Sequence, residues 1–402
     1  MAGRTILTFL VALAAVLGAV YQLRYKEFLS VIGVGRVIEN VGPRDCKIVP
    51  ELQACEKITL HQPSGVLYLA CSSIPNRLVW TPTLLHLNAT ARFATNAEDD
   101  YIATYDPRNA RITHLKASLP AGQPPLSLHG MDIVPSSTNP KDLWVYLVNH
   151  RPFLAPGGGY EDAQKVGANS TIEVFKTTVG GTKLEWVRTF HTPEAIISPN
   201  DLVGLPDGSG VYFTNDAAAK TAFKKHFSLL LRLTDSSVGF CSTSLPASAP
   251  CKLVATLPDV NGIAASPHNS TIYVSNTLRG TITALERQAD DSLVVTDVIP
   301  VGYMIDNLSV DEAGHVWGGS FPYLLALGTA MENSSHPVPS AALRITLNTG
   351  PGSYYGEKYK MERVFMDDGL LVSSTTSAVY DVSRKRLFMH GLISPALTVC
   401  KV

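Results

Sequence analysis

The sequence predicts an all-β protein, and within that class a six-bladed β-propeller. Short apolar runs bounded by Gly, Pro, Asn and Asp recur along the whole chain, whereas amphipathic helical patterns are nearly absent beyond roughly the first thirty residues. A unit made of a turn followed by an apolar strand recurs at intervals of roughly fifty to eighty residues, the spacing of four-stranded blades with varying insertions. These observations favour a ring of blades over a helical or mixed fold.

Six such units can be read along the chain, and each predicts one blade. They lie at residues 63–69, 141–148, 208–213, 269–274, 313–317 and 383–389. In several blades a further strand with an outward-facing pattern follows, for example at residues 171–176 and 281–285. Closing the ring would bring polar residues from distant segments together in a central channel.

The amino terminus carries an apolar run from residue 5 to residue 20, preceded by Arg4 and followed by basic residues. This pattern is typical of a secretory signal peptide or a short signal anchor. Cleavage would expose the bulky Tyr21 and Leu23, and no clean small-x-small site precedes a mature start. We therefore expect an uncleaved anchor in residues 1–28 and a propeller in residues 29–402, with a removed signal peptide as the alternative. The protein would be membrane-anchored with a lumenal or extracellular propeller, or secreted.

The composition agrees with a large globular domain in the secretory pathway. The 402 residues are 45% hydrophobic and 17% charged, and the net charge of −1 gives no electrostatic case for a nucleic-acid partner. Several sequons are plausible glycan acceptors, at Asn88, Asn169, Asn269 and Asn333. Asn307 also begins a sequon, but it must be buried and unmodified if it binds a metal ion.

The six cysteines are an even number, which predicts disulfides in an oxidising compartment. Cys241 and Cys251 flank a loop rich in Ser, Pro and Ala and would close it. Cys46 and Cys400 lie at opposite ends of the expected propeller. A disulfide between them would tie the first strand into the last blade and close the ring.

Carboxylate and amide oxygens recur in short polar signatures, at Glu56 and in residues 198–201, 259–263 and 305–310. Calcium binds about six to eight oxygens of this kind. A calcium held by a mixed set of carboxylates and amides would keep open positions for a carbonyl oxygen and a water, which describes a hydrolase more than a structural clip. Asn261-Gly262 alone is more often a hairpin turn, so the recurrence of polar pairs before apolar strands is what favours a metal site.

Ordered motifs extend beyond the metal signatures. They are Cys46, Glu56, residues 128–131, 147–150, 170–176, 200–203, 261–263 and 305–310, and Cys400. In this order, over roughly residues 30–402, the chain resembles the calcium-dependent paraoxonase/arylesterase lactonases, which are related to gluconolactonase and senescence-marker propellers. The resemblance implies a catalytic calcium held by Glu56, Asn200, Asn261, Asp306 and Asn307.

The resemblance further implies that His129 and His150 form a proton-handling dyad and that the amino-terminal segment anchors the protein to membrane or lipid. Histidine titrates close to neutral pH and can take a proton from a water held at a metal ion. Two alternatives stay open. Both histidines could merely satisfy local carbonyls, or a ligating carboxylate, Asp306 or Glu56, could be the base.

The chain departs from the family at the residue after the glutamate. Family members place an acidic residue there, which holds a second, structural calcium together with the aspartate matching Asp201 and a backbone carbonyl near Met131. Lys57 occupies this position and cannot ligate calcium. A second ion is therefore doubtful, and we expect the Lys57 ammonium to replace it and to pair with Asp201.

Two further departures concern the pocket and the cysteines. Ser320 and Phe321 stand where the family carries a Cys-His pair, so substrate preference cannot be carried over. The cysteines beyond the family's single bridge predict the pairs Cys55–Cys71 and Cys241–Cys251. The Gly-rich loop at residues 152–167 is a candidate lid over the active site, or an insertion without function.

These patterns predict a calcium-dependent hydrolase of lactones or aryl esters. No Gly-x-Ser-x-Gly elbow is present, so a serine nucleophile is not expected. The apolar anchor favours a small lipophilic substrate. The alternatives are a sugar lactonase of the gluconolactonase type and a non-catalytic propeller stabilised by calcium that binds a partner.

Overall fold

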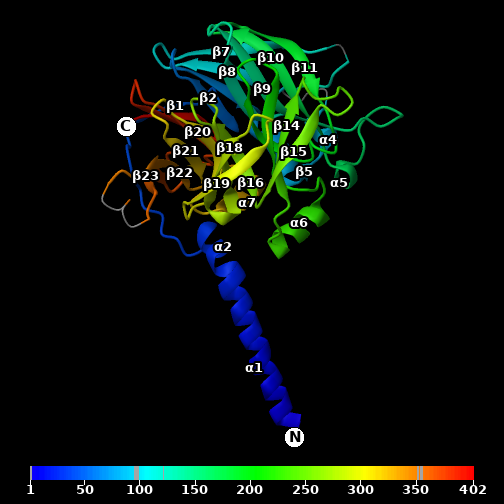
Figure 1. Ribbon diagram of the computed structural model, residues 1–402, viewed down its shortest axis with the longest axis vertical. Coiled ribbons are helices and arrows are strands. Elements are labelled where there is room, and N and C mark those ends of the chain that lie inside the picture. Colours follow the sequence, from blue (N-terminus) through cyan, green and yellow to red (C-terminus); the bar gives the residue numbers. More distant parts are fainter. Residues whose placement is uncertain (1, 95–98, 121, 351–352, 354–355) are drawn as a thin grey trace.

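The computed structural model describes residues 2–94, 99–120, 122–350, 353 and 356–402, and their strands form six four-stranded blades around a central axis (Figure 1). The first blade contains β2 (Lys57–His61), β3 (Val66–Cys71), β6 (Tyr101–Asp106) and β7 (Arg111–Ser118). The second contains β8 (Leu128–Pro135), β9 (Asp142–Arg151), β10 (Asn169–Thr178) and β11 (Lys183–Phe190). The third contains β12 (Pro199–Gly204), β13 (Gly210–Asn215), β14 (Ser236–Ser242) and β15 (Cys251–Leu257).

The other three blades follow the same order from the axis outward. The fourth contains β16 (Val260–Ala265), β17 (Thr271–Asn276), β18 (Thr281–Arg287) and β19 (Leu293–Pro300). The fifth contains β20 (Ile305–Val310), β21 (Val316–Ser320), β22 (Ser340–Leu347) and β23 (Tyr359–Asp367). The sixth contains β24 (Ser377–Asp381), β25 (Arg386–His390), β26 (Leu397–Lys401) and, from the other end of the chain, β1 (Cys46–Val49).

The predicted propeller is confirmed, and the six turn-plus-strand units correspond to the second strands of the six blades, β3, β9, β13, β17, β21 and β25. These strands read as nearly continuous apolar runs because neighbouring blades cover both of their faces. Every residue of β13 is buried, for example. Outer strands such as β15 contain buried, half-buried and exposed residues instead. One feature differs from a simple ring, because the outer strands β7 and β11 pair in parallel and join the first two blades.

The ring closes in the sixth blade, where β1 pairs with β26 and Cys46 lies opposite Cys400 in the register. These two cysteines form a disulfide. The other predicted bridges, Cys55–Cys71 and Cys241–Cys251, are also present. All three predicted pairings are confirmed, and together they use the six cysteines of the chain.

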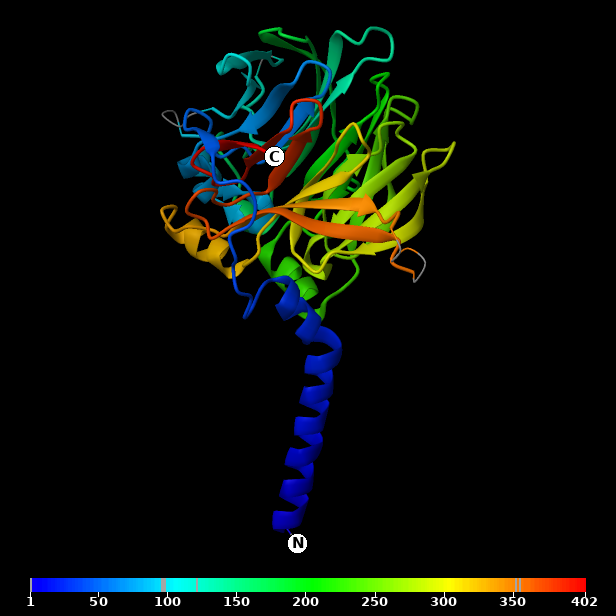
Figure 2. The same cartoon turned by 90° about the vertical axis from the view of Figure 1, so that its left-hand side faces the viewer.

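The amino-terminal segment is a long helix that projects away from the propeller (Figures 1 and 2). It consists of α1 (Ala2–Val20), a π-helical turn at Tyr21–Tyr25 and α2 (Lys26–Val31). Within the described residues, Arg4–Val31 is the one helix long and apolar enough to cross a membrane, a test that a signal sequence also passes. An exposed apolar helix and three disulfides fit a secretory or membrane-anchored protein.

Several short helices interrupt the blades, and the sequence pattern missed the longest of them. They are α3 (Ile74–Val79), α4 (Ala89–Arg92), α5 (Ala163–Val166), α6 (Ala222–Leu231) and α7 (Leu325–Glu332), with 3-10 turns at Pro82–Leu84 and Thr277–Arg279 and a small ladder of β4 (Trp80–Thr81) and β5 (His86–Leu87). In α6, Phe223, Phe227 and Leu230 are exposed, so its apolar residues give no clear buried stripe. Helices α2, α6 and α7 lie at the same end of the propeller (Figure 1).

Candidate metal centre and active site

In four of the blades, the first strand is irregular at an equivalent place, and the site residues lie at these irregularities. The ladder shifts register between Leu128 and Met131, between Pro199 and Leu202, between Val260 and Ile263, and between Ile305 and Leu308. The residues inside these bulges are His129-Gly130, Asn200-Asp201, Asn261-Gly262 and Asp306-Asn307. A bulge leaves residues unpaired and re-aims their side chains. Four blades thus each present at least one polar side chain to the channel through a bulge in the first strand.

Glycine is required in two of these bulges because the neighbouring bulge packs directly on it. A Cβ on Gly262 would lie 2.5 Å from the Asp306 carbonyl oxygen, and one on Gly130 would lie 2.4 Å from that of Asn200. Both distances are far below a van der Waals contact. The site is therefore assembled by backbone packing between adjacent blades.

We expect Gly262→Ala to displace the Asp306-Asn307 bulge, to weaken calcium binding and to lower the free energy of unfolding by about 1–3 kcal/mol, the usual cost of overpacking. Calcium calorimetry and urea denaturation would measure both effects. Gly157→Ala is the matched control, since a Cβ there meets no atom within 4 Å. Equal behaviour of the two variants would contradict the packing argument.

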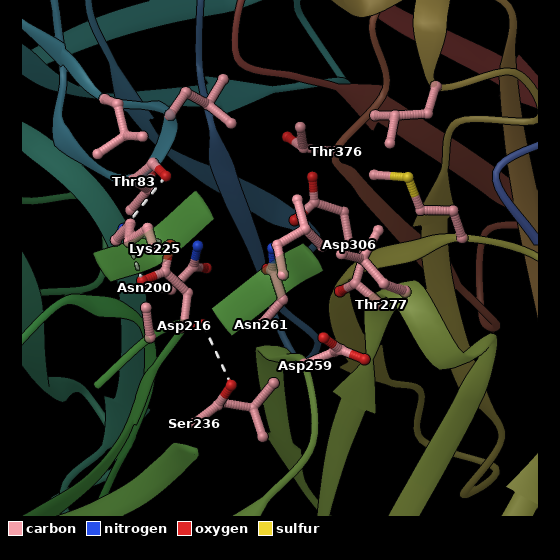
Figure 3. A pocket seen from close by; sticks show the side chains of 18 of the residues that line it. Thr83, Asn200, Asp216, Lys225, Ser236, Asp259, Asn261, Thr277, Asp306 and Thr376 are labelled. Carbon is pink, nitrogen blue, oxygen red and sulfur yellow. Dashed lines mark hydrogen bonds and ion pairs between the residues drawn. The ribbon is translucent and has the colours of Figure 1, made fainter. Parts of the chain in front are cut away.

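Five acceptor oxygens at the centre are buried and have no hydrogen-bond partner among the residues that the structure describes. They are Glu56 Oε2, Asn200 Oδ1, Asn261 Oδ1, Asp306 Oδ1 and Asn307 Oδ1. Figure 3 shows Asn200, Asn261 and Asp306 approaching one another at one side of a pocket. Buried polar atoms are normally satisfied, and a cluster of acceptors without donors is what a hard cation would satisfy. The predicted ligands therefore come together and fit calcium.

Three of the five proposed ligands are amides, and the negative charges of the two carboxyl groups repel each other. Among the described residues no group of three or more His, Cys, Asp and Glu side chains is arranged for a metal. Burial raises the pKa of Asp306 well above its usual range, and the charges of Glu56 and Asp201 raise it further. Burial also raises the pKa of Glu56. A divalent cation would favour the ionised form of both groups.

Side-chain hydroxyls that the sequence reasoning missed hold the ligand backbone in place. Thr376 Oγ1 donates to the Glu56 carbonyl at 2.7 Å, and Ser275 Oγ donates to the Asp306 carbonyl at 2.7 Å. Thr214 Oγ1 donates to the Asn261 carbonyl. A signal was available in the sequence, because a hydroxyl residue followed by Asn ends two of the second strands, β13 at residues 214–215 and β17 at residues 275–276. Glu56 Oε1 in turn accepts from Asn307 Nδ2 at 2.9 Å.

Lys57 pairs with Asp201 as predicted. Its ammonium lies 2.5 Å from Asp201 Oδ2 and donates to the Leu308 carbonyl at 3.0 Å, and both charged side chains are buried. Asp201 Oδ2 also accepts from the Ile263 amide, whereas Asp201 Oδ1 is buried and accepts from no other described residue. The pKa of Asp201 is raised by burial, an effect that the Lys57 charge opposes. The Met131 carbonyl accepts from Thr59 Oγ1 at 3.4 Å, and the Met131 side chain lies in the core.

His129 and His150 lie side by side, with ring centroids 5.3 Å apart. His129 Nε2 is 3.9 Å from Glu56 Oε1, and His150 Nδ1 is 2.8 Å from Ser170 Oγ. His129 Nδ1 and His150 Nε2 are buried and have no hydrogen-bond partner in the described part of the chain. Burial lowers the pKa of both rings, that of His150 to about 3. Each ring therefore keeps a nitrogen available, and His129 also lines the pocket.

The pocket above these residues is a cavity of about 340 Å³ with largely apolar walls. Its floor contains Glu56, Asn200, Asn261 and Asp306, and its apolar lining includes Leu84, Leu229, Met304, Phe321 and Leu327. Phe321, which the sequence singled out, is thus a wall residue. The loop at residues 152–167 contributes none of the lining found, and its Tyr160 ring packs instead near Phe93, with centroids 5.5 Å apart.

Helix α6 forms one rim of the pocket, and its Lys225 is held by an ion pair and a hydrogen bond to other segments. Lys225 Nζ lies 3.1 Å from Asp216 Oδ1 and donates to the Thr83 carbonyl at 3.3 Å (Figure 3). Lys225 and Asp216 both line the cavity. Sequence reasoning missed this ion pair because α6 itself was not recognised.

The family model described as arylesterase matches residues 70–401. The chain belongs to the arylesterase family. Its membership confirms the resemblance found in the motifs. Human serum paraoxonase/lactonase 3 is 24% identical over 357 residues, 88% of each chain.

Other similar proteins are more limited in extent or more distant. Rat serum paraoxonase/arylesterase 2 is 28% identical over 258 residues, which are 63% of this arylesterase and 64% of the rat protein, slightly less than two thirds of its length. Among solved structures, a gluconolactonase from Xanthomonas campestris aligns with a TM-score of 0.47 and 14% identity, covering 90% of this chain and 94% of that one.

Proposed function

We propose that this arylesterase hydrolyses lactones and aryl esters in a calcium-dependent reaction, with Glu56, Asn200, Asn261, Asp306 and Asn307 as the ligands. One observation carries the proposal. Among the described residues, five buried acceptor oxygens without partners lie beside a cavity whose walls are largely apolar. When bound, calcium would supply an electrophile for the substrate carbonyl and for the negative charge that develops on its oxygen.

The residues of the chain would tune the charge of the centre, bind the substrate and accept a proton. The three amide ligands donate oxygens without adding negative charge, which keeps the centre electrophilic. The apolar walls, including Phe321 and Leu229, hold the non-reacting part of the substrate and exclude water. His129 lines the cavity with a ring nitrogen free of partners and would accept the proton of the attacking water, supported by His150.

The test of the proposed reaction is hydrolysis of phenyl acetate, alkyl γ- and δ-lactones and a sugar lactone by the purified full-length protein. We expect turnover with calcium, loss after chelation and recovery on adding calcium back. Turnover of the sugar lactone alone would favour the gluconolactonase type. A stable protein that binds calcium and hydrolyses nothing would favour a binding propeller.

We expect His129→Gln to lower kcat by about 10²–10⁴-fold, the usual contribution of a general base, with calcium affinity unchanged. Stopped-flow hydrolysis and calcium calorimetry on one preparation would measure both quantities. His336→Gln, on a described turn outside the cavity lining, is the matched control. Full activity of His129→Gln would assign the base to a ligating carboxylate, Glu56 or Asp306.

We also propose that α1 anchors the protein in a membrane with the propeller on the lumenal or extracellular side. The exposed apolar surface of α1 and the three disulfides support this arrangement. Of the predicted glycan acceptors, Asn88 and Asn333 are exposed, and Asn169 and Asn269 are half-buried. Asn307 is 1% exposed, as a ligand would be. Glycosidase treatment and alkaline extraction of expressing cells would test topology and anchoring.

A further inference from the structure

The segment that joins the amino-terminal helix to the propeller packs against the substrate pocket. We define the anchor base as residues 25–36. Val31, in this segment, is 3% exposed and belongs to one apolar cluster with Met304, Phe321 and Leu327. These three partners line the cavity above the metal centre. The anchor base and the pocket therefore share one packed layer of side chains.

The anchor base also holds the backbone of two pocket segments. The Leu324 amide donates to the Ile32 carbonyl at 3.0 Å. Gly33 has a φ of +84°, and a Cβ there would lie 1.9 Å from the Pro322 carbonyl oxygen. Arg36 donates to the carbonyls of Pro322 and Gly302, each at 3.0 Å. Residues 302–304 and 321–327 are thus held from outside the cavity.

The opposite wall is contacted by the same segment. Tyr25 Oη donates to the Leu230 carbonyl at 2.8 Å, at the end of α6. The Arg232 guanidinium lies 4.6 Å from the centroid of the Phe28 ring and 3.5 Å from Asp259 Oδ2. Asp259 lines the cavity and precedes Asn261 by two residues. The anchor base therefore contacts both sides of the pocket.

We propose that the anchor base is a positioning element of the active site, which fixes the apolar walls that bind the non-reacting part of the substrate. These walls are loops and short helices outside the blade ladders, and such segments depend on packing for their order. Loss of the anchor base would loosen the walls and leave the metal centre, which the blades hold. Because a wall contact acts on the bound substrate and the transition state alike, its loss raises KM more than it lowers kcat.

The inference rests on the proposed function for its kinetic readout, and hydrogen exchange gives a readout that does not. The variant is Gly33→Ala in the full-length protein, and Gly35→Ala is the matched control. Both glycines have positive φ, but a Cβ on Gly35 meets no atom within 4 Å. We expect Gly33→Ala to raise KM for a long-chain aryl ester about tenfold, with kcat for phenyl acetate and calcium affinity little changed. Amide exchange at residues 302–304 and 321–327 should accelerate.

A second pair of variants keeps the proposal testable if Gly33→Ala does not fold. Arg36→Met removes the donor to Pro322 and Gly302, whereas Arg44→Met removes a linker arginine that binds Asp367 on the fifth blade. Equal effects within each pair, or unchanged exchange in residues 321–327, would overturn the inference. If the wild type hydrolyses no ester, the proposed function fails, and the exchange measurement alone decides the role of the anchor base.

Discussion

Replacing Asp306 with Asn is expected to lower ester and lactone hydrolysis by at least about a hundredfold, and calcium affinity with it. Mutation of the outer-shell partners of metal ligands typically lowers metal affinity or activity about 10–100-fold, so replacement of a direct ligand should lower them more. Asp306 is 7% exposed, lies in the β20 bulge and has an unpartnered oxygen beside the pocket. The substitution keeps the shape of the side chain and removes one of the two carboxylates of the proposed ligand set.

The Asp306→Asn result depends on separating binding from folding. Calcium calorimetry and hydrolysis should be measured on protein whose unfolding midpoint is known, because removal of a buried carboxylate can raise stability in the absence of the ion. Asp290→Asn, in the exposed turn between β18 and β19, controls for the loss of one negative charge. Retention of calcium affinity and activity in Asp306→Asn would remove this residue from the ligand set.

Lys57→Met should be the most destabilising single substitution at the centre, lowering the free energy of unfolding by about 3–5 kcal/mol. The reason is the charge it leaves behind, since Asp201 is fully buried and its partner ammonium lies 2.5 Å away. The double variant Lys57→Met/Asp201→Leu should recover much of the loss, because a buried ion pair is often replaceable by apolar residues. Urea denaturation at saturating calcium would measure these differences.

An exposed ion pair of the same kind provides the control. Lys358 lies 2.6 Å from Asp297 with 61% of its side chain exposed, so Lys358→Met should lower the free energy of unfolding far less than Lys57→Met does. A small effect of Lys57→Met would contradict the view that this pair is a fixed part of the channel. Metal counting that finds two calciums per chain would contradict the idea that Lys57 stands in for a second ion.

The blades could be predicted from the sequence because burial leaves a pattern in it. Strands covered on both faces, such as β13, are largely apolar, and the turns before them require Gly, Asn or Asp. The ligands could be predicted because polar pairs such as Asp306-Asn307 interrupt apolar strands. The bulges that orient these pairs could not, since two unpaired residues carry no pattern other than their own polarity.

Features that depend on contacts between distant segments were missed. Helix α6 carries exposed apolar residues such as Phe223, so its sequence gives no buried stripe. The hydroxyl of Thr376 supports Glu56 across 320 residues of chain, and no local pattern encodes that contact. The same holds for Gly33, because its close approach to Pro322 depends on the fold of the fifth blade.

The sixth blade has a consequence for biosynthesis. Strand β1 can pair with β26 only after β26 has been synthesised, and the two cysteines of the disulfide between them are 354 residues apart. At about 5–20 residues per second, a ribosome needs on the order of 20–70 s to make that interval. Until then Glu56 and Asn307, 251 residues apart, belong to an open arc of blades. A nascent chain would close the ring around the proposed metal centre only once β26 has been made, and a stop codon between β24 and β26 of the sixth blade would yield a polypeptide that carries all five proposed ligands in an open arc.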